Sequence, residues 1–219
     1  MAGSLTARTS RRFGYWFIQL IARCGLKALF GMKVVGLENV PRTGGLWLVS
    51  NHQSNFDPPI VGSTVPREIY FAAKKSLFKG LLGKIIVYCN SIPVNRTGFD
   101  LDIVRKTTTL VKNGNAVIIF PEGTRSLDGT FLPIKGGVGM LLQMAPAMVL
   151  PIRIEGSWRL DKKMYRKEKL CLYVGKPIPP EQFLNVEGEG TERHVAIANA
   201  VFNEIRKLGN GNPERAANE

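Results

Sequence analysis

The stretch GLWLVSNHQSNFDPP, residues 45–59, sets a run of large apolar residues directly before six polar side chains and two prolines. The apolar run predicts a buried strand. The prolines predict a helix start, with Asp57 as N-cap and Pro58 at the first helical position. Because a residue before proline avoids the α conformation, residues 52–57 are predicted to form a compact turn between strand and helix.

That turn holds His52, one of the two histidines in the chain, and Asp57 lies five positions later. Side chains at this spacing are not neighbours on a helix, but in a turn the carboxylate can fold back onto the imidazole. Such a contact would fix the ring tautomer and support the imidazolium that forms when the other nitrogen takes a proton. The turn alone also allows a plainer reading, in which Asp57 only caps the helix and His52 is a hydrogen-bonded loop residue.

Outward from this stretch, apolar runs of strand length alternate with helical patterns through residues 33–209. The alternation predicts one α/β domain with a mostly parallel central sheet flanked by helices. Strands are expected within 32–40, 45–50, 67–73, 91–96, 115–120, 148–154 and 169–178, and helices within 58–65, 74–88, 99–114, 135–145 and 191–209. Residues 210–219 are predicted to be a disordered tail.

Residues 1–32 are predicted to be an amphipathic helical segment that anchors the protein at a membrane interface. One side of the helix would carry Arg8, Arg12, Gln19, Arg23 and Lys27, and the opposite side Phe13, Phe17, Leu20, Ile21, Cys24 and Ala28. A basic face opposite an aromatic-rich face is typical of helices that lie in the headgroup layer. The alternative is a helix that packs on the protein's own core. The sequence contains no run of about 18 apolar residues, so it predicts no helix that spans a membrane.

The chain of 219 residues is 44% hydrophobic and has a formal net charge of +13. This composition supports a sizeable core and excludes a wholly disordered protein. The positive surplus favours polyanionic partners, namely nucleic acid, anionic lipid or phosphorylated substrates. Cys24, Cys89 and Cys171 lie far apart, which predicts reduced core thiols in a protein on the cytosolic side. With His52 and His194 they form no zinc-binding pattern, so no metal site is expected.

The loop FPEGTRS, residues 120–126, follows another run that predicts a buried strand. Arg125 offers a planar fork suited to a phosphate, and the Thr124 hydroxyl and the Gly123 amide are further donors. An ion pair between Arg125 and Glu122 is an alternative use of the arginine, and it is compatible with phosphate binding.

A third loop, IPVNR, ends in Arg96. If the strands are parallel, the three loops leave the same edge of the sheet, where open α/β sheets bind ligands. A base–carboxylate pair and two arginines there predict a substrate with a hydroxyl and a phosphate. The chain has no G-x-S-x-G elbow, phosphate loop or dinucleotide fingerprint. The simplest mechanism is then direct: His52 deprotonates a hydroxyl that attacks an activated carbonyl, without a covalent enzyme intermediate.

These motifs resemble those of the glycerolipid acyltransferases, specifically the bacterial 1-acylglycerol-3-phosphate acyltransferases. The resemblance is carried by NH-x-S-x-x-D at residues 51–57 and by FPEGTRS, and the two motifs together are highly specific. It extends to IPVNR, to AAKKSLF at 72–78, to KGG at 135–137 and to VLPIRIEGS at 149–157, and so covers residues 34–180.

The resemblance implies acyl transfer to the sn-2 hydroxyl of 1-acylglycerol-3-phosphate (lysophosphatidic acid), which gives phosphatidic acid in phospholipid synthesis. The acyl donor would be acyl-CoA or acyl carrier protein, as co-substrate and with no cofactor. His52 would be the general base, oriented by Asp57, and Pro151 would lie near the acyl donor. The substrate contacts would be Arg125, Glu122, Gly123 and Thr124, with Arg96 and Lys74 as further phosphate or donor contacts.

The family also implies an N-terminal membrane anchor, which agrees with the pattern at residues 1–32. It implies a peripheral or monotopic protein on the cytoplasmic face of the inner membrane, in contact with anionic lipid. Two positions depart from the family pattern: Asn95 stands where aspartate is common, and Lys79-Gly80 stands where a proline is frequent. They leave the identity of the acceptor open.

Two other functions are compatible with parts of the sequence. The first is an acyltransferase or transacylase that acts on another lyso-lipid and keeps the same base. The second is a non-catalytic basic protein that binds lipid or nucleic acid. The absence of a recognisable nucleic-acid module counts against nucleic acid as a partner.

Overall fold

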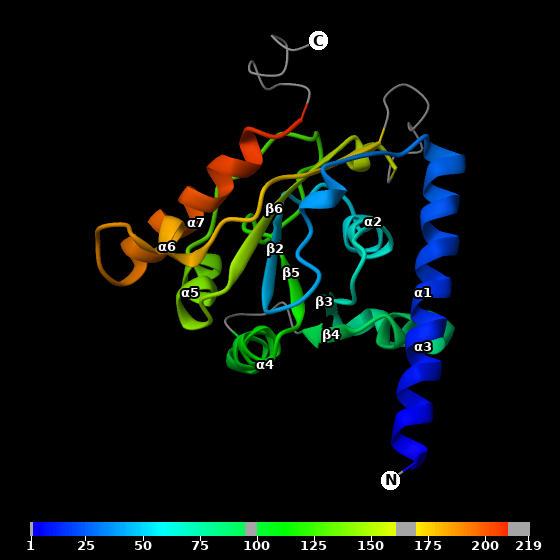
Figure 1. Ribbon diagram of the computed structural model, residues 1–219. Helices are drawn as coiled ribbons and strands as arrows, with labels where there is room; N and C mark the ends of the chain where they lie inside the picture. The colour runs from blue at the N-terminus through cyan, green and yellow to red at the C-terminus, as the bar shows by residue number, and fades with distance from the viewer. Residues whose placement is uncertain (1, 95–99, 161–169, 210–219) are drawn as a thin grey trace.

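The structure is a computed structural model that describes residues 2–94, 100–160 and 170–209, with side chains from residue 13 onward. The described residues form a seven-stranded sheet in the order β1-β7-β6-β2-β5-β3-β4. β6 and β7 run antiparallel, and the other neighbouring strands run parallel. Figure 1 shows this sheet between two helical layers. The predicted α/β fold with a mostly parallel, helix-flanked sheet is therefore confirmed.

The elements follow the predicted alternation of strands and helices. The strands are β1 (Lys33–Val35), β2 (Leu46–Ser50), β3 (Ile69–Lys74), β4 (Ser91–Val94), β5 (Ala116–Ile119), β6 (Met148–Glu155) and β7 (Cys171–Val174). The helices are α1 (Ala2–Phe30), α2 (Asp57–Thr64), α3 (Gly80–Tyr88), α4 (Leu101–Lys112), α5 (Gly137–Met144), α6 (Pro180–Leu184) and α7 (Gly190–Arg206). Short 3-10 turns are η1 (Leu37–Asn39), η2 (Lys75–Leu77) and η3 (Ser157–Arg159).

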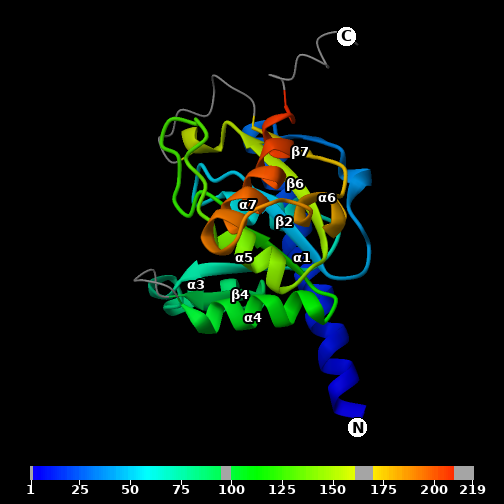
Figure 2. The ribbon, with the colours of Figure 1, turned by 90° about the vertical axis from the view of Figure 1, so that its left-hand side faces the viewer.

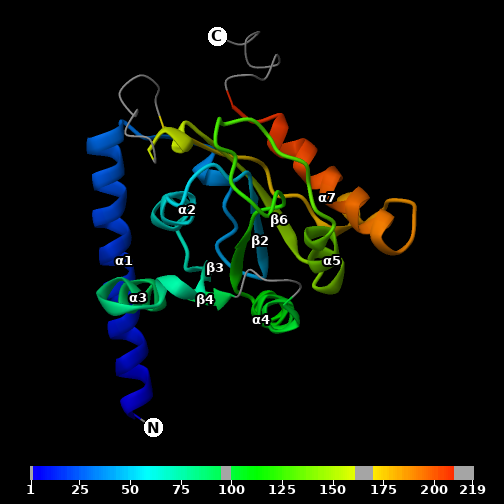
Figure 3. The same cartoon turned by 180° about the vertical axis from the view of Figure 1, so that it is seen from behind.

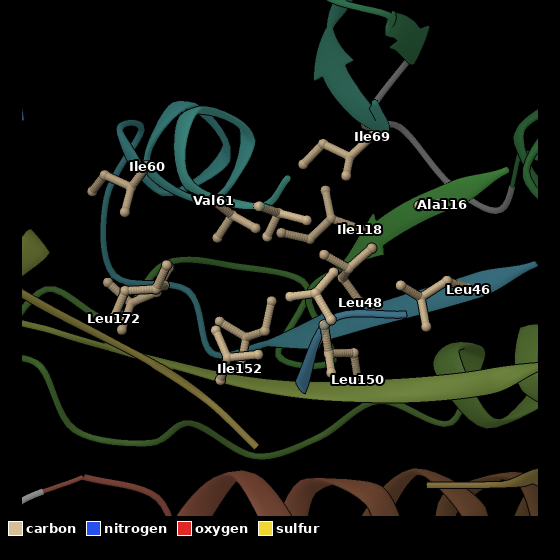
Figure 4. Packing of buried hydrophobic residues seen from close by; sticks show 14 of the residues in the cluster. Leu46, Leu48, Ile60, Val61, Ile69, Ala116, Ile118, Leu150, Ile152 and Leu172 are labelled. Atoms are coloured by element: carbon tan, nitrogen blue, oxygen red, sulfur yellow. The ribbon is translucent and has the colours of Figure 1, made fainter. Parts of the chain in front are cut away.

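β2 lies in the middle of the sheet and is buried on both faces. Leu46 and Leu48 belong to the hydrophobic cluster on the α2 side, and Trp47 and Val49 belong to the cluster on the α7 side. Figure 4 shows the first cluster, in which side chains of α2 cover those of β2, β5 and β6. Alternate side chains of an extended strand point to opposite faces, so a continuous apolar run suits a strand covered on both.

The chain leaves β2 and β5 toward opposite faces of the sheet. Val61 of α2, which follows β2, packs in the first cluster, whereas Leu142 of α5, which follows β5, packs in the second. Figures 2 and 3 show the two layers from different sides. β2 and β5 are adjacent and parallel. A point where neighbouring strands send their connections to opposite faces is where open α/β sheets bind ligands.

α1 packs against the body through a side that the sequence pattern did not identify. The Nε2 amide of Gln19 donates to the carbonyls of Gly62 and Val65, each at 2.7 Å. The buried Tyr15 hydroxyl accepts a hydrogen bond from the Ile69 amide at 3.3 Å. Gln19, assigned to the basic outer face, therefore holds the helix to the end of α2.

The aromatic face of α1 is left exposed. Phe13 is 77% exposed, Phe17 56%, Leu20 58% and Ile21 57%. The alternative of a helix that packs on the protein's own core holds for α1 through the buried Tyr15 and through Leu26 and Phe30, but it does not hold for these exposed side chains. Cys24, on the same face, is exposed as well, so the prediction of three core cysteines is wrong for this residue. The membrane contact of this face stays a prediction.

Two further elements differ from the sequence-based expectation. The helix expected within 74–88 is divided into η2 and α3, because Gly80 has a φ of 58°, in the left-handed region that interrupts a helix. α6 was not expected, because five residues are too few to show a helical period. Among the described residues, no helix is both long and apolar enough to cross a bilayer. The predicted tail, 210–219, lies outside the described residues.

Candidate active site

The turn after β2 is organised by one carboxylate oxygen. Oδ2 of Asp57 lies 2.7 Å from Nδ1 of His52, and it accepts hydrogen bonds from the amides of Gln53 at 2.6 Å and Ser54 at 2.8 Å. The Asp57 side chain is fully buried. The predicted contact between the carboxylate and the imidazole is therefore present.

This contact determines which ring nitrogen of His52 can act as a base. A carboxylate oxygen only accepts hydrogen bonds, so Nδ1 carries the ring hydrogen and Nε2 keeps its lone pair. The side chain is 11% accessible, so the ring is largely withdrawn from water. Its flat face stacks on Phe120 from the neighbouring strand loop, with ring centroids 4.2 Å apart and planes 22° apart. The imidazole is thus held at one edge and one face.

The helix after the turn begins one residue earlier than the sequence predicts. α2 starts at Asp57, and its N-cap is Phe56, which makes no side-chain capping bond. The reading of Asp57 as the N-cap is therefore wrong. Its carboxylate points back into the turn, where three donors converge on it, instead of toward the first turn of α2.

The other polar residues of the motif fasten the turn to the sheet. The Asn51 side chain exchanges two hydrogen bonds with the backbone of Ile154 in β6, at 2.7 and 2.9 Å. The Gln53 side chain donates to the carbonyl of Gly129 at 3.1 Å. The Ser54 hydroxyl accepts from the amide of Phe56 at 3.1 Å. Together these bonds explain why so many polar side chains follow a buried strand.

The loop after β5 lies beside this turn. The Ser126 amide donates to the carbonyl of His52 at 2.8 Å, which joins the two loops directly. Gly123 has a φ of 64°, a conformation that glycine adopts without strain. Gly123 and Thr124 are exposed, and Arg125 is half-buried and interacts with other groups of the protein. The Gly123 amide already donates to the carbonyl of Phe120 at 3.1 Å, so the loop presents the Thr124 hydroxyl and the Arg125 guanidinium close to the histidine turn.

Glu122 is buried, unlike Gly123 and Thr124 after it, and only 1% of its surface is exposed. Its Oε2 accepts a hydrogen bond from the backbone amide of His52 at 3.3 Å. The pKa of Glu122 is raised to about 7, mainly by burial and to a smaller extent by the charge of Asp57, while hydrogen bonds from backbone amides oppose the rise. The Glu122 carboxyl therefore holds the backbone of His52, and it takes up a proton near neutral pH.

A raised pKa makes Glu122 a source of pH-dependent instability. The unfolded chain loses this proton near pH 4.5 and the folded protein near pH 7, so the free energy of unfolding falls as the pH rises between them. We expect Glu122→Gln, which keeps the shape and stays neutral, to stabilise the protein at pH 8 by on the order of 3 kcal/mol. The gain should shrink toward zero near pH 4.5. Urea unfolding of both proteins from pH 4.5 to 8 measures it, and a difference independent of pH would contradict the assignment.

The remaining predicted site residues are placed less closely together. Lys74 is the last residue of β3 and is exposed; by strand register it lies level with Asn51, with β5 between the two strands. Arg96 and Asn95 lie outside the described residues. Pro151 is buried inside β6 opposite Val49, within the sheet.

One candidate residue received no role from its sequence context. A β-carbon built on Gly123 would lie 3.3 Å from the Nζ of Lys135, so this ammonium sits over the glycine of the exposed loop. The Lys135 amide also donates to the carbonyl of Pro121 at 3.0 Å. In the sequence, Lys135 is marked only by the KGG motif. Its position against Gly123 became visible only in the folded chain. In the part of the chain that the structure describes, no group of histidine, cysteine or carboxylate side chains is placed to hold a metal ion.

The fold and the turn define an α/β protein with a buried histidine–carboxylate pair at the carboxyl ends of its strands. The chain belongs to the Acyltransferase family, whose sequence profile matches residues 31–155. It is 29% identical to the 1-acyl-sn-glycerol-3-phosphate acyltransferase of Bacillus subtilis, over 82% of this chain and 89% of that protein. It is 33% identical to the human 1-acyl-sn-glycerol-3-phosphate acyltransferase alpha, over 85% of this chain and 69% of that protein.

A solved structure resembles the whole fold. The crystal structure of the 1-acyl-sn-glycerophosphate (LPA) acyltransferase PlsC from Thermotoga maritima superposes with a TM-score of 0.71. The two sequences are 26% identical, and the match covers 92% of this chain and 82% of the other. The resemblance to glycerolipid acyltransferases seen in the motifs is confirmed.

Proposed function

We propose that the protein transfers an acyl group from a thioester donor, acyl-CoA or acyl carrier protein, to the sn-2 hydroxyl of 1-acyl-sn-glycerol-3-phosphate. The product would be phosphatidic acid. The observation that carries the proposal is the 2.7 Å contact between Nδ1 of His52 and Oδ2 of Asp57, in a family whose relatives have this activity in their names. The reaction needs no cofactor besides the donor.

The proposed steps use His52 first as base and then as acid. Its Nε2 takes the proton of the acceptor hydroxyl while the hydroxyl oxygen attacks the thioester carbonyl. The tetrahedral intermediate collapses, the carbon–sulfur bond breaks, and the leaving sulfur takes the proton back from the imidazolium. The buried Asp57 carboxylate stabilises the imidazolium, and little water competes for it.

The acceptor phosphate is proposed to bind at the loop after β5. Arg125 would supply a guanidinium and Thr124 a hydroxyl, and the exposed Gly123 would let the phosphate approach the loop backbone. Lys135 adds a second cation, because its ammonium lies against Gly123. Glu122 would support this site through the His52 backbone, since its carboxyl is buried. Lys74 and Arg96 remain proposed contacts for the phosphate or the donor.

Attachment to a membrane would bring the enzyme to its acceptor. Exposed aromatic and aliphatic side chains on α1, with Arg23 and Lys27 exposed beside them, suit a helix that lies among headgroups. We place the protein on the cytoplasmic face of the inner membrane, as a peripheral or monotopic protein, with anionic lipid as partner and no nucleic acid.

A panel of acceptors tests the proposed reaction. Purified protein is incubated with acyl-CoA or acyl carrier protein and with each lyso-lipid in turn, and release of free thiol is followed together with the lipid product. We expect the highest kcat/KM with 1-acylglycerol-3-phosphate. A clear preference for a lyso-lipid with a larger head group would identify an acyltransferase of another acceptor. Thiol release without an acylated lipid, or no turnover with any acceptor, would exclude acyl transfer to lyso-lipids.

The variant Arg125→Lys tests the phosphate contact. Lysine keeps the charge but cannot offer the planar fork, so acceptor binding should weaken by about 1–3 kcal/mol if the contact is bidentate. The KM for the acyl donor should change less. Arg159→Lys, on η3, serves as a control for the same substitution outside the loop. A rise in the donor KM alone would reassign Arg125 to the donor.

A further inference from the structure

α3 has the composition of a buried helix but lies at the surface. Its sequence is GLLGKIIVY, and Gly83 is its one buried residue. Leu81 is 74% exposed, Leu82 53%, Ile85 42% and Val87 50%. A helix that is apolar nearly all round is normally covered by protein or by lipid. Exposed apolar surface of this extent marks a contact with a partner or a membrane.

The exposed helix adjoins the aromatic face of α1. The Tyr88 hydroxyl, at the end of α3, lies against Gly14, where a β-carbon would collide with it. α3 overlaps α1 in the views of Figures 1 and 3, and the contact of Tyr88 with Gly14 places the end of α3 beside α1. We call the combined exposed side chains the apolar flank, which consists of Leu77, Leu81, Leu82, Ile85 and Val87 with Phe13, Trp16, Phe17, Leu20 and Ile21.

The segments that carry the apolar flank have positive charges and no negative ones. Residues 2–30 contain five arginines and lysines, residues 69–88 contain four lysines, and neither segment contains an aspartate or a glutamate. Lys75, Lys79 and Lys84 are exposed among the apolar residues of η2 and α3. The chain has 17 acidic residues in all, so their absence here is a local feature of the surface.

This combination favours one occupant over the others. A second copy of the chain would bring the same positive charges into an apolar interface without carboxylates to pair with them. A nucleic acid would match the charge but leave the leucines and aromatics exposed to water. A bilayer with anionic lipid satisfies both, because its acyl region takes the apolar side chains and its headgroups take the lysines.

We propose that η2 and α3 form a second membrane-insertion element, which docks together with the exposed face of α1 on a bilayer that contains anionic phospholipid. η2 begins directly after Lys74, where β3 reaches the carboxyl edge of the sheet that also bears His52. Insertion of η2 and α3 therefore brings the candidate active site to headgroup level. The inference rests on the proposed function only in taking the acceptor to be a membrane lipid.

The test uses the full chain with the substitutions Leu81→Asp and Leu82→Asp combined. Both side chains are more than half exposed, so the folded protein should tolerate the change. Binding is measured by co-sedimentation with vesicles of phosphatidylglycerol and phosphatidylcholine across a salt series. We expect the vesicle partition coefficient to fall about tenfold or more, at high salt as well as at low salt, because leucine insertion does not depend on salt.

A second variant, Lys84→Glu, examines the charge. Its binding should fall about fivefold or more at low salt and approach the wild-type value at high salt. Two matched controls lie elsewhere on the surface: Met144→Asp on α5 for the exposed apolar residue, and Lys176→Glu after β7 for the charge. Both should bind vesicles as the wild-type protein does, and circular dichroism with urea unfolding checks the fold of each variant.

Activity assays separate this inference from the proposed function. With a short-chain soluble acceptor, the Leu81→Asp, Leu82→Asp protein should keep the wild-type kcat/KM, whereas with vesicle-embedded acceptor its rate should fall with its binding. If the wild-type protein acylates no acceptor but the vesicle results hold, the proposed function fails and the membrane element stands. Unchanged sedimentation of the folded double variant would overturn the membrane element. So would a change from dimer to monomer with intact vesicle binding, because the flank would then join two copies.

Discussion

The variant His52→Ala is expected to lose acyl transfer almost completely while it keeps its fold. General-base catalysis contributes about 10²–10⁴-fold, and the only other histidine, His194, is on α7. The loss should appear in kcat, with a smaller change in KM, because the imidazole acts on the hydroxyl proton in the transition state. Steady-state release of thiol from acyl-CoA, with the product lipid quantified, measures the effect.

A second substitution and a control make the result specific to the base. His52→Gln keeps much of the side-chain volume against Phe120, so it should be as inactive as the alanine variant if chemistry, and not packing, is lost. His194→Ala removes the other histidine and should keep wild-type turnover. If His52→Ala retained half of the wild-type kcat, the proposed mechanism would have to be abandoned.

Asp57→Asn is expected to have the second largest effect. Asparagine can place an oxygen near the three donors that converge on Oδ2, but it brings no negative charge to an imidazolium that is largely shielded from water. It can also donate to Nδ1 and so stabilise the wrong tautomer of the ring. We expect kcat to fall about 10²–10⁴-fold, as for other bases that lose their orienting carboxylate.

The control for this variant is Asp102→Asn, the same substitution at an exposed position in the first turn of α4. It should leave turnover unchanged. Unfolding in urea must accompany the assay, because loss of charge-assisted bonds can also weaken the turn by about 1–3 kcal/mol. An Asp57→Asn protein with wild-type kcat and lowered stability would show that the carboxylate only holds the turn together.

The strands and the contact between His52 and Asp57 could be predicted because the information for them is local. The continuous apolar run of β2 predicts a strand covered on both faces, which the clusters around Leu48 and Trp47 confirm. The contact of Asp57 with His52 closes over five residues, and the prolines behind it leave the turn few conformations. The position of the N-cap was the part that failed, because three donors in the turn compete for the same carboxylate.

The properties that depend on burial could not be predicted in this way. The sequence does not decide which side of α1 packs against the protein. In the structure it is the side with Gln19 and Tyr15, which form hydrogen bonds with the end of α2 and with β3. α3 looks like a core helix from its composition, yet its side chains lie at the surface. Helical periodicity shows which residues share a face of the helix. It does not show whether that face contacts protein, lipid or water.

The sequence by itself therefore determined the order of the strands and of the longer helices, the turn that pairs His52 with Asp57, and the basic and apolar character of the N-terminal segment. Tertiary structure alone decided that Glu122 is buried behind the His52 amide with a pKa raised to about 7, and that Lys135 lies over Gly123. The physical reason is the range of the interactions. Turns and strand propensity act between neighbours in the chain, whereas desolvation and the approach of charges depend on segments that folding brings together.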